Sequence, residues 1–71
     1  MEKYANYSGT SGVSAYEIGS DYIRVQFSSG SIYQYSYRKA GQSHVANMKQ
    51  LAMKGSGLNS YINSHVKFKY D

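Results

Sequence analysis

Two stretches of alternating residues, joined by a short loop that ends in glycine, constrain the fold more than any other feature of this sequence. Over residues 22–27 apolar and polar side chains alternate, which is typical of a strand with one face on a core. Residues 28–30, Ser-Ser-Gly, fit a three-residue hairpin loop with glycine at the left-handed position. This loop length pairs Val25 with Tyr33 in a second strand over residues 31–37.

The register assigns the side chains of the hairpin to two faces. A two-residue loop would reverse the assignment and place Gln34 among apolar residues, so we exclude it. The predicted core face carries Ile23, Val25, Phe27, Tyr33, Tyr35 and Tyr37. The opposite face, which we expect to be uncovered, carries Tyr22, Arg24, Gln26, Ile32, Gln34 and Ser36.

The remaining elements follow from periodicity and from glycine positions. Residues 13–19 predict a strand before the hairpin, which makes a three-stranded antiparallel meander. A helix is expected from a cap at Gly41 or Ser43 to about Lys54, and a short second helix from about Asn59. The tail over 65–71 alternates like a strand that could complete this sheet or extend a partner's. The fold class is therefore α+β, with the meander packed against one long and one short helix.

The small size of the chain limits its stability. A domain of 71 residues buries only about 60% of the surface that its unfolded chain exposes. Small domains compensate with disulfides, metals or self-association, and this sequence has no cysteine. Because His44 and His65 lie far apart in the sequence, we expect no metal site and predict a homo-oligomer. We divide the chain into a flexible N-terminal arm over 1–12 and a single domain over 13–71.

Charge and tyrosine content indicate the kind of partner. The net charge of +4 favours anionic partners, and nine tyrosines supply flat amphipathic surfaces of the kind that binding sites use. No apolar run reaches the roughly 20 residues needed to span a bilayer, so we expect a cytoplasmic protein without a membrane partner. The ligand class that these features favour is anionic and carries an aromatic base.

The sequence offers no catalytic constellation. Glu2 and Asp71 lie near the termini, and Asp21 stands where aspartate is a routine turn residue. The sequence also contains no phosphate-binding or dinucleotide fingerprint and no nucleophile elbow. We therefore expect a binding module that needs no cofactor, and not an enzyme.

A loop between the two predicted helices is the first candidate binding element. The stretch Lys54-Gly55-Ser56-Gly57 leads to Asn59 at a helix start, and its N–H groups with Lys54, Ser56 and Asn59 could hold a phosphate. The alternative is that Gly55 caps one helix and Asn59 begins the next, which is a common structural use of these residues.

Basic and aromatic residues near the hairpin supply the other candidates. Arg38 and Lys39 follow the last hairpin strand and could contact phosphate, with Tyr37 or Tyr22 stacking on a base. Their alternative role is solvated surface charge. Arg24 is in mid-strand and needs a partner, either in a pocket or at a subunit interface. Tyr16 and Asn63 complete the set of candidate ligand-binding residues.

The order and spacing of several residues resemble the KTSC domain, a small module named from the C-terminus of some lysyl-tRNA synthetases. The resemblance rests on Ser14, Ile18-Gly19, Asp21, Ile23, Val25, Phe27, Gly30, Tyr33 and Tyr35, and downstream on Lys54-Gly55, Leu58-Asn59, Ile62 and Tyr70. It covers most of the chain. Where the family has Val-Pro after the third strand, this chain has Tyr37-Arg38-Lys39-Ala40 and no proline.

The resemblance implies a β-meander packed on helices, found as an appendage or as a stand-alone bacterial or viral protein. It implies no reaction. Stand-alone viral proteins of this build can sequester nucleotide immune signals, so our first hypothesis is a phage anti-defence protein that binds a cyclic oligonucleotide in pockets of a homo-oligomer in the host cytoplasm. The alternatives are a tRNA- or RNA-binding module and a protein-interaction module.

Overall fold

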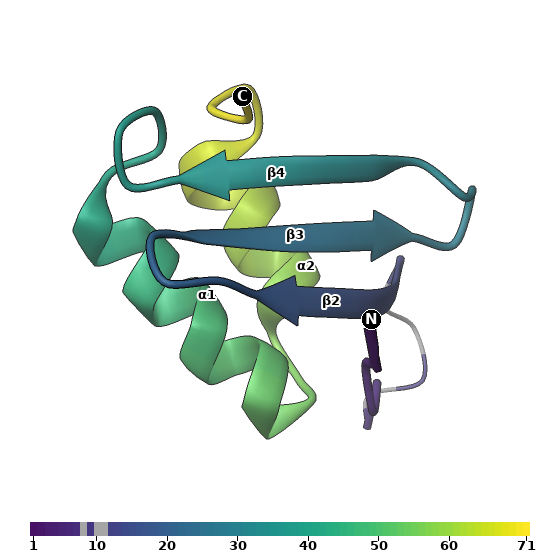
Figure 1. Ribbon diagram of the computed structural model, residues 1–71. Helices are drawn as coiled ribbons and strands as arrows, with labels where there is room; N and C mark the ends of the chain where they lie inside the picture. Colours follow the sequence, from purple (N-terminus) through teal and green to yellow (C-terminus); the bar gives the residue numbers. More distant parts are fainter. Residues whose placement is uncertain (8, 10–11) are drawn as a thin grey trace.

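Within the residues that the computed structural model describes, 1–7, 9 and 12–71, the chain forms a four-stranded antiparallel sheet with its helices on one face (Figure 1). The elements in chain order are β1 Glu2–Lys3, β2 Val13–Ile18, β3 Tyr22–Phe27, β4 Ile32–Ser36, α1 Gln42–Lys54, α2 Leu58–Tyr61 and the π-helix η1 Ile62–Val66. Neighbouring strands in the sheet are also neighbours in sequence. The α+β prediction, with one long and one short helix, is confirmed.

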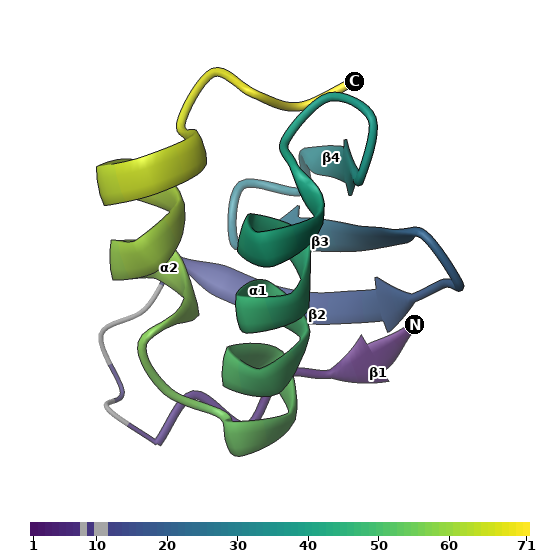
Figure 2. The same ribbon diagram turned by 90° about the vertical axis from the view of Figure 1, so that its left-hand side faces the viewer.

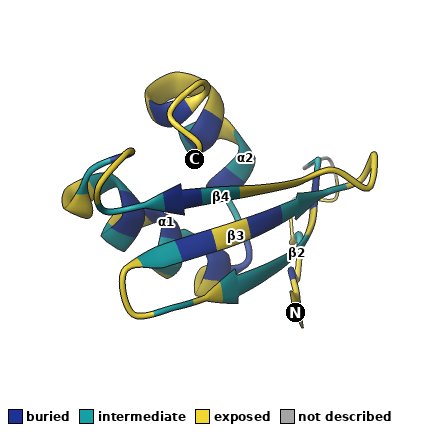
Figure 3. Cartoon of the chain, turned by 45° about the horizontal axis from the view of Figure 1, so that its top comes forward, coloured by how far each residue is buried: buried dark blue, intermediate teal, exposed yellow. Residues whose placement is uncertain are grey.

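The β3–β4 hairpin has the predicted register. Val25 lies opposite Tyr33, and Ile23 lies opposite Tyr35. Gly30 has a φ of 97°, the left-handed conformation that the three-residue loop requires. As a result Ile23, Val25 and Tyr35 are almost completely buried, while Arg24 on the other face is exposed (Figure 3).

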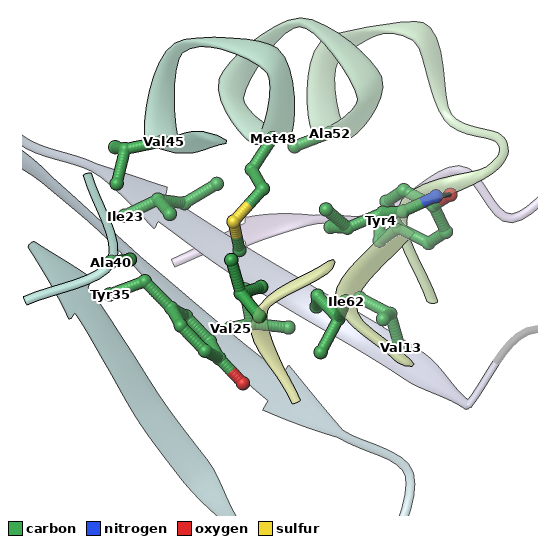
Figure 4. Close-up of a cluster of buried hydrophobic side chains, with 12 residues drawn as sticks. Tyr4, Val13, Ile23, Val25, Tyr35, Ala40, Val45, Met48, Ala52 and Ile62 are labelled. Carbon is green, nitrogen blue, oxygen red and sulfur yellow. Dashed lines mark hydrogen bonds between the residues drawn. The ribbon is translucent and has the colours of Figure 1, made fainter. Parts of the chain in front are cut away.

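One contiguous core lies between the sheet and the helices (Figure 4). It contains Tyr4, Val13, Ile23, Val25, Tyr35, Ala40, Val45, Met48, Ala52, Leu58, Ile62 and Val66. Tyr37 is partly buried against this core. Tyr33 differs from the prediction, because 36% of its surface is exposed.

Glycines set both ends of α1. The N-cap of the helix is Gly41, one of the two caps that the sequence predicts. The helix ends at Gly55, which has a left-handed φ of 84° and donates its N–H to the Leu51 carbonyl at 2.9 Å. Helix α2 then begins at Leu58 with Gly57 as its N-cap, so Asn59 lies inside the first turn and does not cap it. No helix of the described part of the chain has the length and apolar character needed to cross a membrane.

The N-terminal segment differs from the predicted flexible arm. Residues Glu2–Lys3 pair antiparallel with β2 as the fourth strand of the sheet (Figure 2). Tyr4 is 2% exposed, and its hydroxyl accepts a hydrogen bond from the Leu58 N–H at 3.3 Å. The buried Tyr4 ring adds apolar area to this small core, and this burial holds the segment against the domain. Of the predicted arm, Ser8, Thr10 and Ser11 lie outside the described residues.

The C-terminal tail differs as well. Residues 67–71 are not a strand, and the fourth strand of the described sheet is β1. The Asp71 N–H donates to the Gln34 carbonyl at 2.8 Å, so the tail meets β4 at a single backbone hydrogen bond. The alternation of Val66, Phe68 and Tyr70 does not arise from a strand, since Val66 completes η1 and is buried whereas Phe68 is 77% exposed.

Candidate ligand-binding pocket

An aromatic pocket of about 220 Å³ opens between the sheet, η1 and the C-terminal tail. Its lining residues are Phe27, Tyr33, Tyr35, Ile62, Asn63, Lys67, Phe68 and Tyr70. The sheet supplies Tyr33 and Tyr35, and the tail supplies Tyr70. The centroid of the Tyr70 ring lies 4.7 Å from that of Tyr33 and 6.4 Å from that of Tyr35. Phe27 packs edge-on to Tyr33 at 5.7 Å. Flat rings exposed on several sides of a small opening suit a planar ligand.

The hydroxyl group of Tyr35 is the polar feature of this pocket. Only 1% of the Tyr35 residue is exposed. Its hydroxyl has no hydrogen-bond partner among the described residues, but the oxygen atom is not fully buried and lines the pocket. Figure 4 shows the ring beside Val25 with the hydroxyl oxygen pointing away from Val45. Since buried tyrosine hydroxyls normally find a partner, this one is available to a ligand.

Burial raises the pKa of Tyr35 to about 12, with smaller contributions from Tyr33 and Tyr70. At neutral pH the hydroxyl is therefore protonated. It can donate a hydrogen bond to an acceptor atom of a ligand, such as a carbonyl oxygen or a ring nitrogen.

The raised pKa predicts a specific pH dependence of stability. The native state holds the Tyr35 proton more tightly than the unfolded chain, whose pKa is about 10.0, so this contribution is complete below pH 10 and is lost as the pH rises to about 12. The full shift would amount to about 2.7 kcal/mol, and because the hydroxyl faces an open pocket we expect about 1–2 kcal/mol. Denaturant unfolding of wild type and Tyr35→Phe, at about pH 9 and about pH 11.5, measures it. An equal loss of stability in both proteins would contradict the assignment, because their other tyrosines are the same.

A polar contact beyond the pocket holds the tail in place. The Asp71 carboxylate accepts hydrogen bonds from the Ser36 hydroxyl at 2.7 Å and from the Gln34 amide at 2.9 Å. The Ser36 hydrogen bond in particular lowers the pKa of Asp71. Together with the buried Val66 at the other end, this anchor fixes the segment that carries Phe68 and Tyr70.

The rim of the pocket carries one cation and one amide. Lys67 is exposed, and its ammonium lies 5.5 Å from the centre of the Phe68 ring. Asn63 is exposed at the first turn of η1. π-Helical turns occur frequently at functional sites, because the wider turn re-aims side chains. A ligand with a base inside the pocket would meet an amide and a positive charge at its mouth.

A second and larger hollow, the N-terminal groove, carries acidic side chains in its lining. Its volume is about 460 Å³, and it is lined by Met1, Glu2, Tyr16, Glu17, Ile18 and Met53. Two of these six side chains are carboxylates. An anionic ligand is therefore better matched by the smaller aromatic pocket than by this groove.

The structure gives Arg24 and Tyr22 partners within the chain. On the exposed sheet face the Tyr22 hydroxyl donates to the Glu17 carboxylate at 2.9 Å, and this hydrogen bond raises the pKa of Tyr22. The Arg24 guanidinium lies 3.6 Å from the same carboxylate and 5.5 Å from the Tyr22 ring, and its Nε donates to Gln34 Oε1 at 2.8 Å. Arg24 was expected to find its partner in a pocket or at a subunit interface; instead its partners are Glu17 and Gln34 of the same exposed sheet face.

The other candidates from the sequence lie in separate places. Tyr37 faces Lys49, whose ammonium is 5.0 Å from the ring centre, and Arg38 and Lys39 are exposed in the turn that follows. Lys54 is exposed at the end of α1. Tyr16 lines the N-terminal groove, and Asn63 alone of the predicted set lines the aromatic pocket.

The Lys54–Asn59 loop is in contact with the N-terminal segment of the chain. Gly55 is buried as the cap of α1, and its carbonyl accepts a hydrogen bond from the Tyr7 N–H at 2.9 Å. Asn59 is partly buried beside Gly12, and Ser56 is also partly buried. These contacts support the structural use of Gly55 as a helix cap, whereas the expected cap at Asn59 is wrong, because Gly57 is the N-cap of α2.

Helix packing also brings together the two histidines, which the sequence leaves far apart. The rings of His44 and His65 are 5.6 Å apart, and His44 Nδ1 lies 2.8 Å from the Tyr61 hydroxyl, which also accepts a hydrogen bond from Asn47. In the described part of the chain no three metal-ligating side chains gather in a group that could hold an ion.

Comparisons of the chain with protein-family models, with curated proteins and with solved structures found no match. The resemblance to the KTSC domain therefore remains a prediction from the sequence.

Proposed function

We propose that this chain is a non-enzymatic binding module that takes the base of a small anionic nucleotide into the aromatic pocket. The observation that carries the proposal is the Tyr35 hydroxyl, a protonated donor that lines an aromatic-walled opening and has no hydrogen-bond partner among the described residues. A planar base with acceptor atoms satisfies the walls and the hydroxyl at once.

Charge and volume narrow the ligand class. The pocket volume of about 220 Å³ lies below the roughly 300–1,000 Å³ of typical small-molecule sites, so it suits a ring system and leaves sugar and phosphate outside. Lys67 at the mouth supports an anionic group there. A cyclic oligonucleotide, the ligand favoured by the sequence, has several bases and would use the pockets of more than one copy.

Binding without turnover would make the protein a sequestering agent, as the sequence hypothesis of an anti-defence protein requires. The alternative function, binding of an RNA strand, would need a continuous basic surface. Arg24 is tied to Glu17 and Gln34 on the outer face, and Lys67 lies at the pocket. This distribution favours a compact ligand over a long strand.

Calorimetric titration with a matched ligand set tests the proposal. The set contains adenosine monophosphate, adenosine, ribose 5-phosphate, a cyclic dinucleotide, a cyclic trinucleotide and a short RNA. We expect measurable binding of nucleotides, weaker binding of adenosine, and none of the sugar phosphate. Affinity should fall only modestly with salt, because one or two phosphate contacts release few counterions.

Variants assign the roles. Tyr33→Ala should weaken nucleotide binding by about 10- to 100-fold through lost stacking, and Tyr35→Phe by roughly 3- to 10-fold through one lost hydrogen bond. Lys67→Ala should weaken the nucleotide by a few-fold and leave adenosine unaffected.

Lys54→Ala, an exposed lysine at the far end of α1, is the control and should bind like wild type. Loss of binding in Lys54→Ala but not in Lys67→Ala would move the site to the loop that the sequence suggested. Binding of RNA alone with a steep salt dependence would replace the proposal by the nucleic-acid alternative, and no binding of any ligand would refute both.

A further inference from the structure

The C-terminal tail carries a large aromatic side chain that is mostly exposed. Phe68, one of the two phenylalanines of the chain, is 77% exposed and lies between Lys67 and Lys69 in the sequence. The other phenylalanine, Phe27, is half-buried against the core. An exposed ring flanked by cations is a feature of interaction surfaces, where an aromatic anchor enters a pocket and charges surround it.

The lining of the N-terminal groove combines apolar and acidic side chains, which match an aromatic ring flanked by lysines. Met1, Ile18 and Met53 expose 53%, 39% and 64% of their surface around it. Glu2 and Glu17 add two of the four acidic residues of a basic protein. Its volume of about 460 Å³ is within the range of sites that hold a bulky group. Methionine side chains adapt their shape to an incoming aromatic ring.

The two features lie at opposite edges of the sheet, so one copy cannot fill its own groove. The strand order is β1-β2-β3-β4; the groove is built on β1 and β2, and the tail is anchored on β4 through Asp71 and Gln34. Figure 2 shows β1 with the end of α1 at one side of the molecule and the C-terminal tail at the other.

We propose that the chain associates with itself head to tail, with Phe68 of one copy inserted into the N-terminal groove of the next. Lys69 then lies near the carboxylate of Glu2, while the Glu17 carboxylate keeps its contacts with Tyr22 and Arg24. This contact is heterologous, because different surfaces meet, so its rotation closes a ring or else extends a filament. It also gives a small domain without disulfides additional apolar area to bury. The open side of the aromatic pocket, of which Phe68 is part of the rim, then faces the neighbouring copy.

Complementing variants test the head-to-tail geometry in the absence of any nucleotide, so the result is independent of the proposed ligand. Met53→Asp spoils the groove and leaves Phe68 in place, whereas Phe68→Ser removes the ring and leaves the groove intact. Both side chains lie outside the core, so circular dichroism should show the wild-type fold. Ile32→Ser, on an exposed residue of the uncovered face, is the matched control.

Native mass spectrometry and sedimentation velocity over a roughly hundredfold concentration range give the readout. We expect oligomers for wild type and Ile32→Ser, and monomers for each of the two variants alone. An equimolar mixture of Met53→Asp and Phe68→Ser should give a one-to-one heterodimer and nothing larger, because one intact ring meets one intact groove. A wild-type monomer at every concentration, variants that still associate, or a mixture that stays monomeric would each overturn the proposal.

Discussion

Replacing Tyr4 by alanine should cost most of the stability of this domain. Truncating a buried aromatic residue costs about 3–5 kcal/mol, and a domain of this length has a total of only about 4–11 kcal/mol. Tyr4 is 2% exposed and joins the start of the chain to the start of α2 through the Leu58 N–H. We expect Tyr4→Ala to be largely unfolded or to unfold at very low denaturant.

Two further variants separate the contributions. Tyr4→Phe keeps the ring and removes only the acceptor for the Leu58 N–H, so it should cost about 1 kcal/mol. Tyr7→Ala is the control, because Tyr7 is 80% exposed, and it should change stability by less than about 0.5 kcal/mol. Guanidinium unfolding followed by circular dichroism measures all three. A Tyr4→Ala protein as stable as Tyr7→Ala would show that the N-terminal segment does not pack as described.

The second large effect is expected for Gly55→Ala. Gly55 has a φ of 84°, and a Cβ there would lie 2.7 Å from the Ala5 Cβ and 2.9 Å from the Tyr7 ring. The left-handed conformation costs an alanine about 1–2 kcal/mol, and the overlap with the N-terminal segment adds about 1–3 kcal/mol. We therefore expect a loss of about 2–5 kcal/mol in the free energy of unfolding.

Gly30→Ala is the matched control for that substitution. Gly30 has a similar φ of 97°, but a Cβ there would meet nothing within 4 Å. It should show the conformational cost alone, about 1–2 kcal/mol. Denaturant unfolding of both variants gives the difference, which reports the close approach of the N-terminal segment to Gly55. Equal losses would mean that this close approach is absent.

The parts of the fold that the sequence predicts well are those with a local cause. Alternation over β3, the three-residue loop and Gly30 define the hairpin register completely, and all three are visible within about 15 residues. Gly41 and Gly55 similarly mark the ends of α1. Each of these depends on conformational preferences of nearby residues and not on distant packing.

The two termini were not predictable in the same way. β1 is only two residues long, too short to show an alternation, and Tyr4 is buried by partners that come much later in the chain. The alternating tail has the pattern of a strand, but Val66 completes η1, and the backbone hydrogen bond from the tail to β4 comes from Asp71 at its end. The same tail carries three of the seven pocket residues that the sequence analysis did not select, namely Lys67, Phe68 and Tyr70.

The sequence indicates the types of residue in the candidate site but not the position of the pocket. The abundance of tyrosine drew attention to aromatic surfaces, but Tyr33 and Tyr35 were assigned to the core by the same periodicity that places them in β4. Whether these two core-facing tyrosines also line an opening depends on the path of the tail, and no local pattern encodes that path. A signal was present in Phe68, a large ring between two lysines, which is an unusual neighbourhood for a core residue.

The hydrogen bond between Tyr4 and Leu58 also has a consequence for the order of folding. The two residues are separated by 54 positions, whereas the hairpins and helices are built from short-range contacts. Loop-closure entropy favours the local elements first, so the meander and α1 can form before the N-terminal segment has anything to pack against. During synthesis the segment that contains Tyr4 is thus made well before α2, but it becomes native only when α2 has also been synthesised.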